Sequence, residues 1–379
     1  MKNQPPLTQR LESLDILRGF DLFCLVTLEI VLHPLQRAVN TPWFDSFMWG
    51  FSHVQWEGFS TWDLVMPLFL FMSGVSMPFA FSRFKNHPNK KTVYWRIFKR
   101  VLLLWIFGMM CQGNLLALDP DRIYLYSNTL QSIAVGYAIA ALLFLHFRTS
   151  VQIGVAIAFL LVSWLVMEFV TVQGYGGGDY TPDGNLAEWM DRTVLGRFRD
   201  QATVVDGEVV FSAHYRYTWI WSSLNFGVTV LSGLFAGQLI KNKLEAKLKI
   251  KWLLGIGVAL VVLGWLWGLQ LPVIKKIWTS SMVLVSSGYC FLLMGLFYYW
   301  IDYKGHQKNL TWLKVYGMNS IAAYLLASII NFRCIGESLF YGLQPWLGNY
   351  YPVLLAVCNA GIIYFILWIL YKRNIFLKV

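Results

Sequence analysis

The sequence predicts an all-α polytopic transmembrane bundle of about ten helices, forming a single domain over residues 1–379. Three observations predict this class. The chain is 57% hydrophobic and only 13% charged, whereas a soluble domain carries roughly 25% charged residues. Apolar runs of about 20 residues, enough to cross roughly 30 Å of hydrocarbon, recur along the chain. Lys and Arg concentrate in alternate connecting segments, as membrane orientation requires.

Ten apolar runs follow one another along the chain, and their ends are defined to within several residues. They lie near 16–33, 62–81, 101–118, 129–147, 151–172, 219–240, 252–271, 279–301, 314–331 and 352–371. The first run is not predicted to be a cleaved signal peptide, because Asp15 and Arg18 stand at its start and it has no small-residue cleavage site.

The positive charge predicts an orientation. If the N-terminus is cytoplasmic, 21 of the 31 Lys and Arg fall in cytoplasmic segments, so both termini are predicted to be inside. The long segment 173–218 is then outside, and we expect it to form a folded cap of short helices over the outer mouth. The net charge of +11 reflects this orientation and not nucleic-acid binding.

The segment from His53 to Gly74 combines ionisable residues with an apolar run. Trp56, Glu57 and Asp63 accompany His53 at the mouth of the run that starts at Leu64. Ionisable groups at a membrane helix are costly and are candidates for function. A carboxylate beside an imidazole can fix its tautomer and raise its basicity, as a general base requires. The alternative is a structural histidine at the interface.

Asp15 and Arg18 are three residues apart and would share one helix face. They form either an interfacial ion pair or a cytoplasmic element that organises a phosphate-rich cofactor. No spacing of His or Cys predicts a metal site, and the five scattered cysteines predict no disulfide framework.

The segment 272–281 opens another apolar run with Lys275, Lys276, Trp278 and the hydroxyls of Thr279, Ser280 and Ser281. Donors, an aromatic surface and a helix start suit an anionic or sugar group. Snorkelling lysines with an aromatic anchor explain the pattern equally well.

Polar residues also stand inside two other apolar runs. Gln131 lies in the run at 129–147, and Asn319 and Ser320 lie in the run at 314–331. Such residues either hydrogen-bond neighbouring helices together or line a cavity.

Taken in order, these motifs resemble the heparan-α-glucosaminide N-acetyltransferase family over most of the chain. The matching residues include Leu14-Asp15-Ile16-Leu17-Arg18-Gly19, His53-x-x-Trp56-x-Gly58, Asp63-Leu64-Val65-x-Pro67, Pro272-Val273-x-Lys275-Lys276-x-Trp278-Thr279-Ser280 and Gly317-Met318-Asn319-Ser320. Many spaced motifs in one order are more specific than any single motif.

The resemblance implies a transmembrane acetyltransferase that moves acetyl from cytosolic acetyl-CoA to an amino sugar across the membrane. It implies that His53 is the catalytic histidine and that Asp63 belongs to the same site. The substrate-binding residues expected with them are Trp56, Glu57, Lys276, Trp278, Ser280 and Asn319. The residues expected near the cofactor are Asp15, Arg18, Gln131 and Ser320.

The chain departs from the family at two points. Glu57 stands where the best-known members have Asn, and the chain begins almost at the first shared motif. The expected location is therefore the bacterial inner membrane. The expected partners are acetyl-CoA, a sugar or glycan acceptor and membrane lipid, without metal or nucleic acid, and a homodimer is left open.

Other functions stay open at this level. An O-acyltransferase acting on a cell-envelope or secondary-metabolite acceptor would use the same residues. A polar-solute transporter would also use Asp63, Gln131 and Asn319, although it usually shows paired broken-helix halves, which this sequence lacks. A membrane scaffold with a structural histidine is the third alternative.

Overall fold

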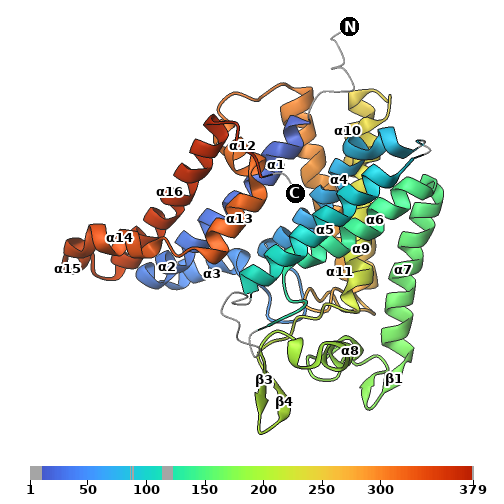
Figure 1. The fold of residues 1–379 in the computed structure, drawn as a ribbon, viewed down its shortest axis with the longest axis horizontal. Coiled ribbons are helices and arrows are strands. Elements are labelled where there is room, and N and C mark those ends of the chain that lie inside the picture. Colours follow the sequence, from blue (N-terminus) through green and yellow to red (C-terminus); the bar gives the residue numbers. More distant parts are fainter. Residues whose placement is uncertain (1–10, 86, 88, 113–122, 378–379) are drawn as a thin grey trace. The chain divides into compact units, whose positions relative to one another are not determined.

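The computed structural model describes residues 11–85, 87, 89–112 and 123–377, which are mostly helical (Figure 1). The chain divides into two compact units, and each is described by itself. The first unit comprises Met1–His53, Ser60–Val65 and Leu293–Lys378. The second unit comprises Val54–Phe59 and Met66–Leu292, together with residue 379. A single domain over residues 1–379 stays a prediction.

The first unit contains most of the N-terminal and C-terminal helices. They are α1 (Glu12–Phe23), α2 (Glu29–Val39), α3 (Pro42–Met48), α12 (Thr311–Met318), α13 (Ser320–Ile329), α14 (Arg333–Phe340), α15 (Gln344–Leu347) and α16 (Tyr351–Lys372). A π-helical turn, Cys24–Leu28, joins α1 to α2 without interrupting the helical path.

The second unit contains the central helices. They are α4 (Val65–Lys85), α5 (Lys91–Gln112), α6 (Thr129–His146), α7 (Thr149–Phe169), α8 (Leu186–Leu195), α9 (Ser222–Lys241), α10 (Ala246–Trp267) and most of α11 (Ser280–Phe297). Two short hairpins, β1 (Thr171–Val172) with β2 (Tyr175–Gly176) and β3 (Ala202–Val205) with β4 (Glu208–Phe211), complete it.

Seven helical segments of the described chain are long and apolar enough to cross a membrane. They are Thr61–Lys85, Thr129–His146, Thr149–Phe169, Ser222–Lys241, Ala246–Trp267, Ser280–Tyr303 and Arg333–Lys372. The chain is therefore a helical, multi-pass membrane protein. Seven of the ten predicted spans coincide with these segments.

The other three predicted spans are also helical in their described residues, but those helices are not both long enough and apolar enough to be counted as membrane-spanning. The helices around 16–33 carry Asp15, Arg18, Asp21 and Glu29, and the first half of α5 carries four basic residues. The predicted span 314–331 is broken at Asn319 into α12 and α13. The end of the predicted span 101–118 lies outside the described residues, so a count of ten stays a prediction.

Within the first unit, α1 packs directly against α12. A Cβ added at Gly317 would lie 1.9 Å from the carbonyl oxygen of Asp15, and one added at Gly19 would lie 1.9 Å from that of Leu313. Only glycine permits such an approach of two helix backbones. Ile16, Ile301 and Leu313 form a buried cluster of the same unit.

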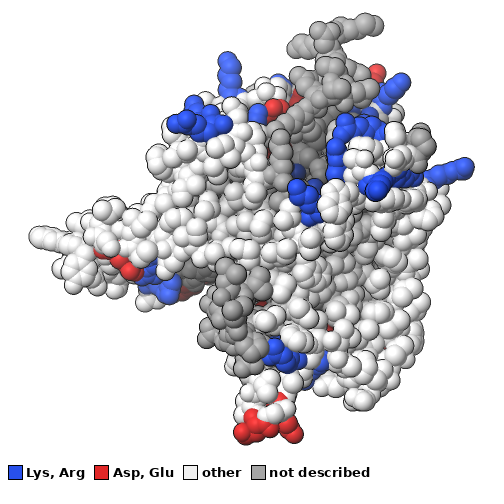
Figure 2. All heavy atoms as spheres, in the orientation of Figure 1, with Lys and Arg blue, Asp and Glu red and all other residues white. Residues whose placement is uncertain are grey.

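One end of the second unit is basic. The Lys241 ammonium, at the end of α9, donates to the carbonyl oxygen of Pro78 and to the Ser82 hydroxyl of α4. Lys90 donates to the carbonyl oxygen of Leu145 at the end of α6. Cations near helix C-termini are stabilised by unsatisfied carbonyls, and Figure 2 shows Lys and Arg gathered over this end. This clustering agrees with the predicted charge alternation.

The segment 173–218 is folded and contains short helices, as predicted, but it also contains β-strands that the sequence analysis did not predict. It contains the helix α8, the 3₁₀ turn Gly196–Phe198, the strand β2 and the hairpin of β3 with β4. Asp206 and Gly207 both have positive φ, 53° and 85°, and they turn the chain between β3 and β4. An Asp-Gly pair flanked by Val-rich runs is a strong hairpin signal. The β3–β4 hairpin could therefore have been predicted from the sequence Val204-Val205-Asp206-Gly207-Glu208-Val209.

Buried charges hold this segment together. Arg199 is fully buried and donates to Glu188 at 2.6 Å, while Asp191 accepts the backbone N–H groups of Trp219 and Ile220 at 2.8 and 2.9 Å. Burial raises the pKa of Asp191 to about 7, although both backbone donors act in the opposite direction. The Asp191 carboxyl thus fixes the chain just before α9.

Candidate active site

His53 and Asp63 lie side by side in the first unit. His53 Nδ1 is 2.8 Å from Asp63 Oδ1. The imidazole is 42% exposed, whereas the carboxylate is only 2% exposed. An ionised carboxylate can only accept hydrogen bonds, so Nδ1 carries the proton and Nε2 is the basic nitrogen. A buried carboxylate that orients a reachable imidazole is the arrangement a general base requires.

Ser60 holds the Asp63 carboxylate through the oxygen that His53 does not contact. Ser60 was not among the predicted site residues. The Ser60 backbone N–H and its hydroxyl both lie 3.0 Å from Asp63 Oδ2. Ser60 and Asp63 form a reciprocal capping box at the start of the 3₁₀ turn Thr61–Leu64, which leads into α4. Ser-x-x-Asp before an apolar run is the sequence signature of such a cap, so Ser60 could have been identified from sequence.

Two further predicted pairs lie in the first unit. Asp15 and Arg18 form the predicted ion pair, with Nη1 and Oδ1 3.7 Å apart. Asp15 is buried, and Arg18 is partly exposed. Asn319 holds the C-terminal segment: its Nδ2 donates to the carbonyl oxygen of Ile375, and its Oδ1 accepts the backbone N–H of Leu377. Ser320 begins α13.

Trp56 and Glu57 lie beside the segment 272–281 in the second unit. Glu57 forms an antiparallel bridge with Ile274, and the backbone N–H of Gly58 donates to the carbonyl oxygen of Val273 at 2.8 Å. The structure therefore brings together two motifs that are more than 200 residues apart. Glu57 itself is exposed.

Tyr180 connects the Trp56 motif to α7. Trp56 Nε1 donates to the Tyr180 carbonyl oxygen at 2.9 Å, and the Tyr180 hydroxyl donates to Glu168 at 2.7 Å. Burial, followed by the neighbouring Glu168, raises the pKa of Tyr180 above its usual range. The phenol therefore stays protonated and continues to donate. Glu168 was not among the predicted residues, and only the tertiary contact identifies it.

The residues predicted from the segment 272–281 differ in their surroundings. Lys276 Nζ lies 5.9 Å from the centre of the Tyr217 ring and is partly exposed. Trp278 and Ser280 are each 1% exposed. Trp278 Nε1 donates to Thr229, and the Ser280 hydroxyl donates to the carbonyl oxygen of Leu160. The structure therefore gives Trp278 and Ser280 packing partners, whereas Lys276 is accessible.

Gln131 caps the helix in which it lies. Its Oε1 accepts the backbone N–H groups of Ser127 and Asn128 at 2.8 and 3.0 Å, and its Nε2 donates to the carbonyl oxygen of Leu125 at 2.8 Å. Gln131 is completely buried. These bonds use its amide to start α6, which is sufficient to explain a Gln at this position.

The site as described is two constellations, one in each unit. The first holds the His53–Asp63–Ser60 triad, in which an oriented imidazole can accept a proton or attack an electrophilic carbonyl. The second holds Trp56, Glu57 and Lys276 on paired segments, with an aromatic ring, a carboxylate and a cation. Among the described residues, no three His, Cys, Asp or Glu side chains are grouped to hold a metal ion.

Comparison with known proteins agrees with the sequence motifs. Residues 10–177 match the family model described as heparan-alpha-glucosaminide N-acetyltransferase, catalytic. This range contains His53, Trp56, Glu57, Ser60 and Asp63. The motifs at 272–281 and 317–320 lie beyond it.

Two curated proteins are similar along most of the chain. Human heparan-alpha-glucosaminide N-acetyltransferase is 26% identical over 440 aligned residues, which cover 98% of this chain and 60% of that protein. The mouse protein of the same name is 22% identical over 383 residues, covering 87% of this chain and 57% of that protein. The chain thus spans about 60% of the length of these relatives. The resemblance predicted from the motifs is confirmed.

Proposed function

We propose that this chain, similar to the heparan-α-glucosaminide N-acetyltransferases, is itself a transmembrane acetyltransferase that uses acetyl-CoA. Its acceptor would be an amino sugar or a related glycan on the membrane face opposite the basic segments. The observation that carries the proposal is the 2.8 Å contact of His53 Nδ1 with the buried Asp63 carboxylate. The similarity to named acetyltransferases indicates which reaction such a dyad would catalyse.

In the direct route, His53 acts as a general base. The acceptor amine attacks the thioester carbonyl of acetyl-CoA, the C–N bond forms, and the C–S bond breaks. The nitrogen must lose one proton as it becomes an amide, and His53 Nε2 accepts it. The proton then passes to the departing thiolate, which gives CoA-SH. Asp63 stabilises the imidazolium that forms in between.

In the two-step route, His53 acts as a transient acetyl carrier. Nε2 attacks the thioester carbonyl, the C–S bond breaks, and CoA leaves as a thiolate that takes a proton from solvent, while the acetyl-imidazole keeps its Nδ1 proton on the bond to Asp63. The acceptor amine then attacks the acetyl-imidazole and regenerates His53. This route would separate the two half-reactions, as an acetyl group crossing a bilayer requires. Both routes need the Nε2 lone pair, which the bond to Asp63 provides.

Acetyl-CoA would enter from the basic side of the membrane. Arg18 in the first unit is one candidate for its phosphates, and Arg96, Lys99 and Arg100 in the second unit are others. Arg100 lies over the Tyr137 ring at 4.2 Å, and its buried Nε has no hydrogen-bond partner among the described residues. Asp15 would act by orienting Arg18.

The proposal is tested with purified protein in detergent, wild type beside His53→Ala. Each protein receives radiolabelled acetyl-CoA with and without glucosamine, and CoA release and labelled products are followed. We expect acetyl-glucosamine from wild type and none from His53→Ala, which should still bind acetyl-CoA. Label retained on wild-type protein without acceptor would identify the two-step route. His87→Ala, an exposed histidine of the second unit, is the matched control.

If wild type neither binds nor consumes acetyl-CoA, the acetyltransferase assignment is wrong, and a transporter or scaffold becomes the better hypothesis. If CoA is released only with hydroxyl acceptors, the enzyme is an O-acyltransferase instead.

A further inference from the structure

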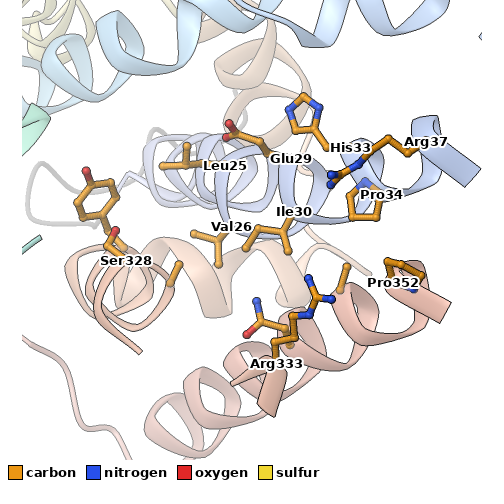
Figure 3. Close-up of a pocket in the computed structure, with 14 residues that line it drawn as sticks. Leu25, Val26, Glu29, Ile30, His33, Pro34, Arg37, Ser328, Arg333 and Pro352 are labelled. Atoms are coloured by element: carbon orange, nitrogen blue, oxygen red, sulfur yellow. The ribbon is translucent and has the colours of Figure 1, made fainter. Parts of the chain in front are cut away.

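A polar groove opens in the first unit beside the start of a membrane-spanning helix. It has a volume of about 530 Å³, within the range of small-molecule sites. Residues of α2, α13, α14 and α16 and of the π-helical turn line it (Figure 3). Its charged and polar side chains include Glu29, His33, Arg37, Arg333 and Asn359. None of these residues was among the predicted site residues.

The mouth of the groove lies at the level of a membrane surface. The helix α16 belongs to a membrane-spanning segment and has 22 residues, about 33 Å of helix, which is enough to cross the hydrocarbon layer. Pro352, in its first turn, lines the groove, and Figure 3 shows Arg37 and Pro34 at the same end. Asn359 follows Pro352 by two turns, about 10 Å deeper. The groove therefore runs from the membrane surface into the bilayer.

The helices that precede α16 present an exposed apolar face beside this mouth. Figure 1 shows α14 and α15 running across the end of α16. On its packed side, α14 meets α16 at Gly336, where an added Cβ would lie 3.2 Å from Cys358 Sγ. The exposed large side chains of the segment include Ile335, Leu339, Tyr341 and Trp346, and Trp346 is 87% exposed. Aromatic and apolar side chains at this level of a membrane lie among lipids, so the face suits acyl chains.

Two arginines face the groove from different helices. Arg37 lies in the last turn of α2 and Arg333 in the first turn of α14, and Figure 3 shows their guanidinium groups turned toward the space between the helices. Arg333 Nε donates to Glu337 at 3.0 Å. Its terminal nitrogens carry four further N–H donors, since a guanidinium has five. Paired guanidinium groups at a membrane surface suit a phosphate.

The deeper part of the groove holds hydrogen-bond acceptors. Asn359 Oδ1 is buried and has no hydrogen-bond partner among the described residues, which is unfavourable within a membrane helix. The Glu29 carboxylate lies on the same face of α2 as Arg37, about 12 Å along the helix axis. Because a carboxylate and an amide oxygen both accept, this part suits a cationic donor. The groove thus offers donors for an anion and acceptors for a cation.

We propose that the groove binds a phospholipid with a primary amine in its headgroup, the chemistry of phosphatidylethanolamine. The phosphate lies between Arg37 and Arg333, the ammonium group donates to Glu29 and Asn359, and the acyl chains lie along the exposed face of α14 and α15. Each charge of the headgroup then meets an opposite charge. A choline headgroup has no N–H, so it would leave Asn359 Oδ1 without a donor. The inference goes beyond the proposed acetyl transfer and does not depend on it.

The test measures lipid affinity of the full chain in detergent by native mass spectrometry, with phosphatidylethanolamine and phosphatidylcholine of identical acyl chains. Wild type should bind the ethanolamine lipid at least about tenfold more tightly, because hydrogen bonds to charged groups are strong. Asn359→Leu and Glu29→Gln should each reduce this ratio to about threefold or less. Arg37→Gln and Arg333→Gln should weaken both lipids about tenfold. Arg373→Gln, an exposed arginine of the same unit outside the groove, should change neither affinity.

A second measurement follows thermal unfolding in nanodiscs. The Tm of each variant in phosphatidylcholine alone shows that it is folded. Adding phosphatidylethanolamine should then raise the Tm of wild type and of Arg373→Gln by more than that of Asn359→Leu or Arg333→Gln, since a ligand stabilises the state that binds it.

Equal affinity of wild type for the two lipids would overturn the proposal. Tighter binding of phosphatidylglycerol than of phosphatidylethanolamine would also overturn it, because the arginines alone would then select the ligand. Equally tight binding of soluble phosphoethanolamine would show that acyl chains contribute nothing and that the ligand is not a lipid. A lipid-free dimer that dissociates on Trp346→Ser would show that a second copy covers the face of α14 and α15 instead.

Discussion

His53 owes its chemical character to a carboxylate that water scarcely reaches. Asp63 accepts from His53 on one oxygen and from Ser60 on the other, so its position is fixed by the capping box and not by the imidazole. A charge that is buried and held in this way keeps one tautomer of the ring. In the proposed mechanism, the basic nitrogen is therefore selected before any substrate arrives.

Replacing Asp63 with Asn tests this selection. The amide would fit the same space but could donate to Nδ1, which favours the tautomer with hydrogen on Nε2 and removes the base. We expect kcat to fall by about 10²- to 10⁴-fold while acetyl-CoA still binds. The measurement is acetyl transfer beside equilibrium binding of acetyl-CoA.

Asp45→Asn is the matched control, because Asp45 is an exposed acid of the same unit whose side chain bonds to Gln36. Near-normal turnover by Asp63→Asn would show that the carboxylate does not set the tautomer.

Among single residues, His53 lies beside Asp63, whereas the roles predicted for several neighbours stay predictions. Gln131, Trp278 and Ser280 were expected to line the site because they are polar or aromatic within apolar runs. In the structure their polar atoms bond to backbone or side chains of the same unit. A sequence shows that a polar group is inside a membrane helix, but not which partner satisfies it.

At the scale of elements, close helix packing depends on a few glycines. The approach of α1 to α12 leaves no room for a side chain at Gly317. In contrast, a Cβ at Gly361, in α16, would meet nothing within 4 Å. The same residue type therefore has opposite roles in two helices of one unit.

Substituting Ala at these two positions gives a matched pair. Gly317→Ala should lower the free energy of unfolding by about 1–3 kcal/mol, because the added methyl group must push two backbones apart. Gly361→Ala should be neutral or stabilising by up to about 1 kcal/mol, since Ala is the better helix former. Thermal unfolding in detergent measures both, and equal Tm values for the two variants would contradict the packing argument.

The sequence located the helices better than the turns between them. Apolar runs of sufficient length predicted the seven long membrane helices, because burial in lipid demands continuous apolar helix. The β3–β4 hairpin was missed because the segment 173–218 was expected to fold into short helices and its turn residues were not considered. The Asp-Gly turn at 206–207 shows that local turn chemistry would have corrected this expectation.

For the whole molecule, the distribution of Lys and Arg predicts how the chain sits in a membrane. Lys247 at the start of α10 and Asp206 at the β3–β4 turn are both exposed and are predicted to face opposite sides. In the proposed function, this orientation would set the side from which acetyl-CoA enters and the side on which the acceptor is found.

A cysteine introduced at each of these two positions tests the orientation in a background with the exposed Cys334 replaced by Ser. In intact cells a membrane-impermeant maleimide should label Asp206→Cys but not Lys247→Cys, which should react only after permeabilisation. The parent with Cys334→Ser alone gives the background labelling. Labelling of Lys247→Cys in intact cells would reverse the proposed direction of transfer.

The sequence by itself determined the protein class, the main helices and the His53–Asp63 pair, because hydrophobicity, helix length and short spacings are local properties. Only the tertiary structure decided that Glu57 pairs with Ile274 and that Gly317 packs against the backbone of Asp15. Such contacts join residues more than 200 positions apart. They follow from how apolar surfaces pack and how buried polar groups find partners, which depends on the folded chain as a whole.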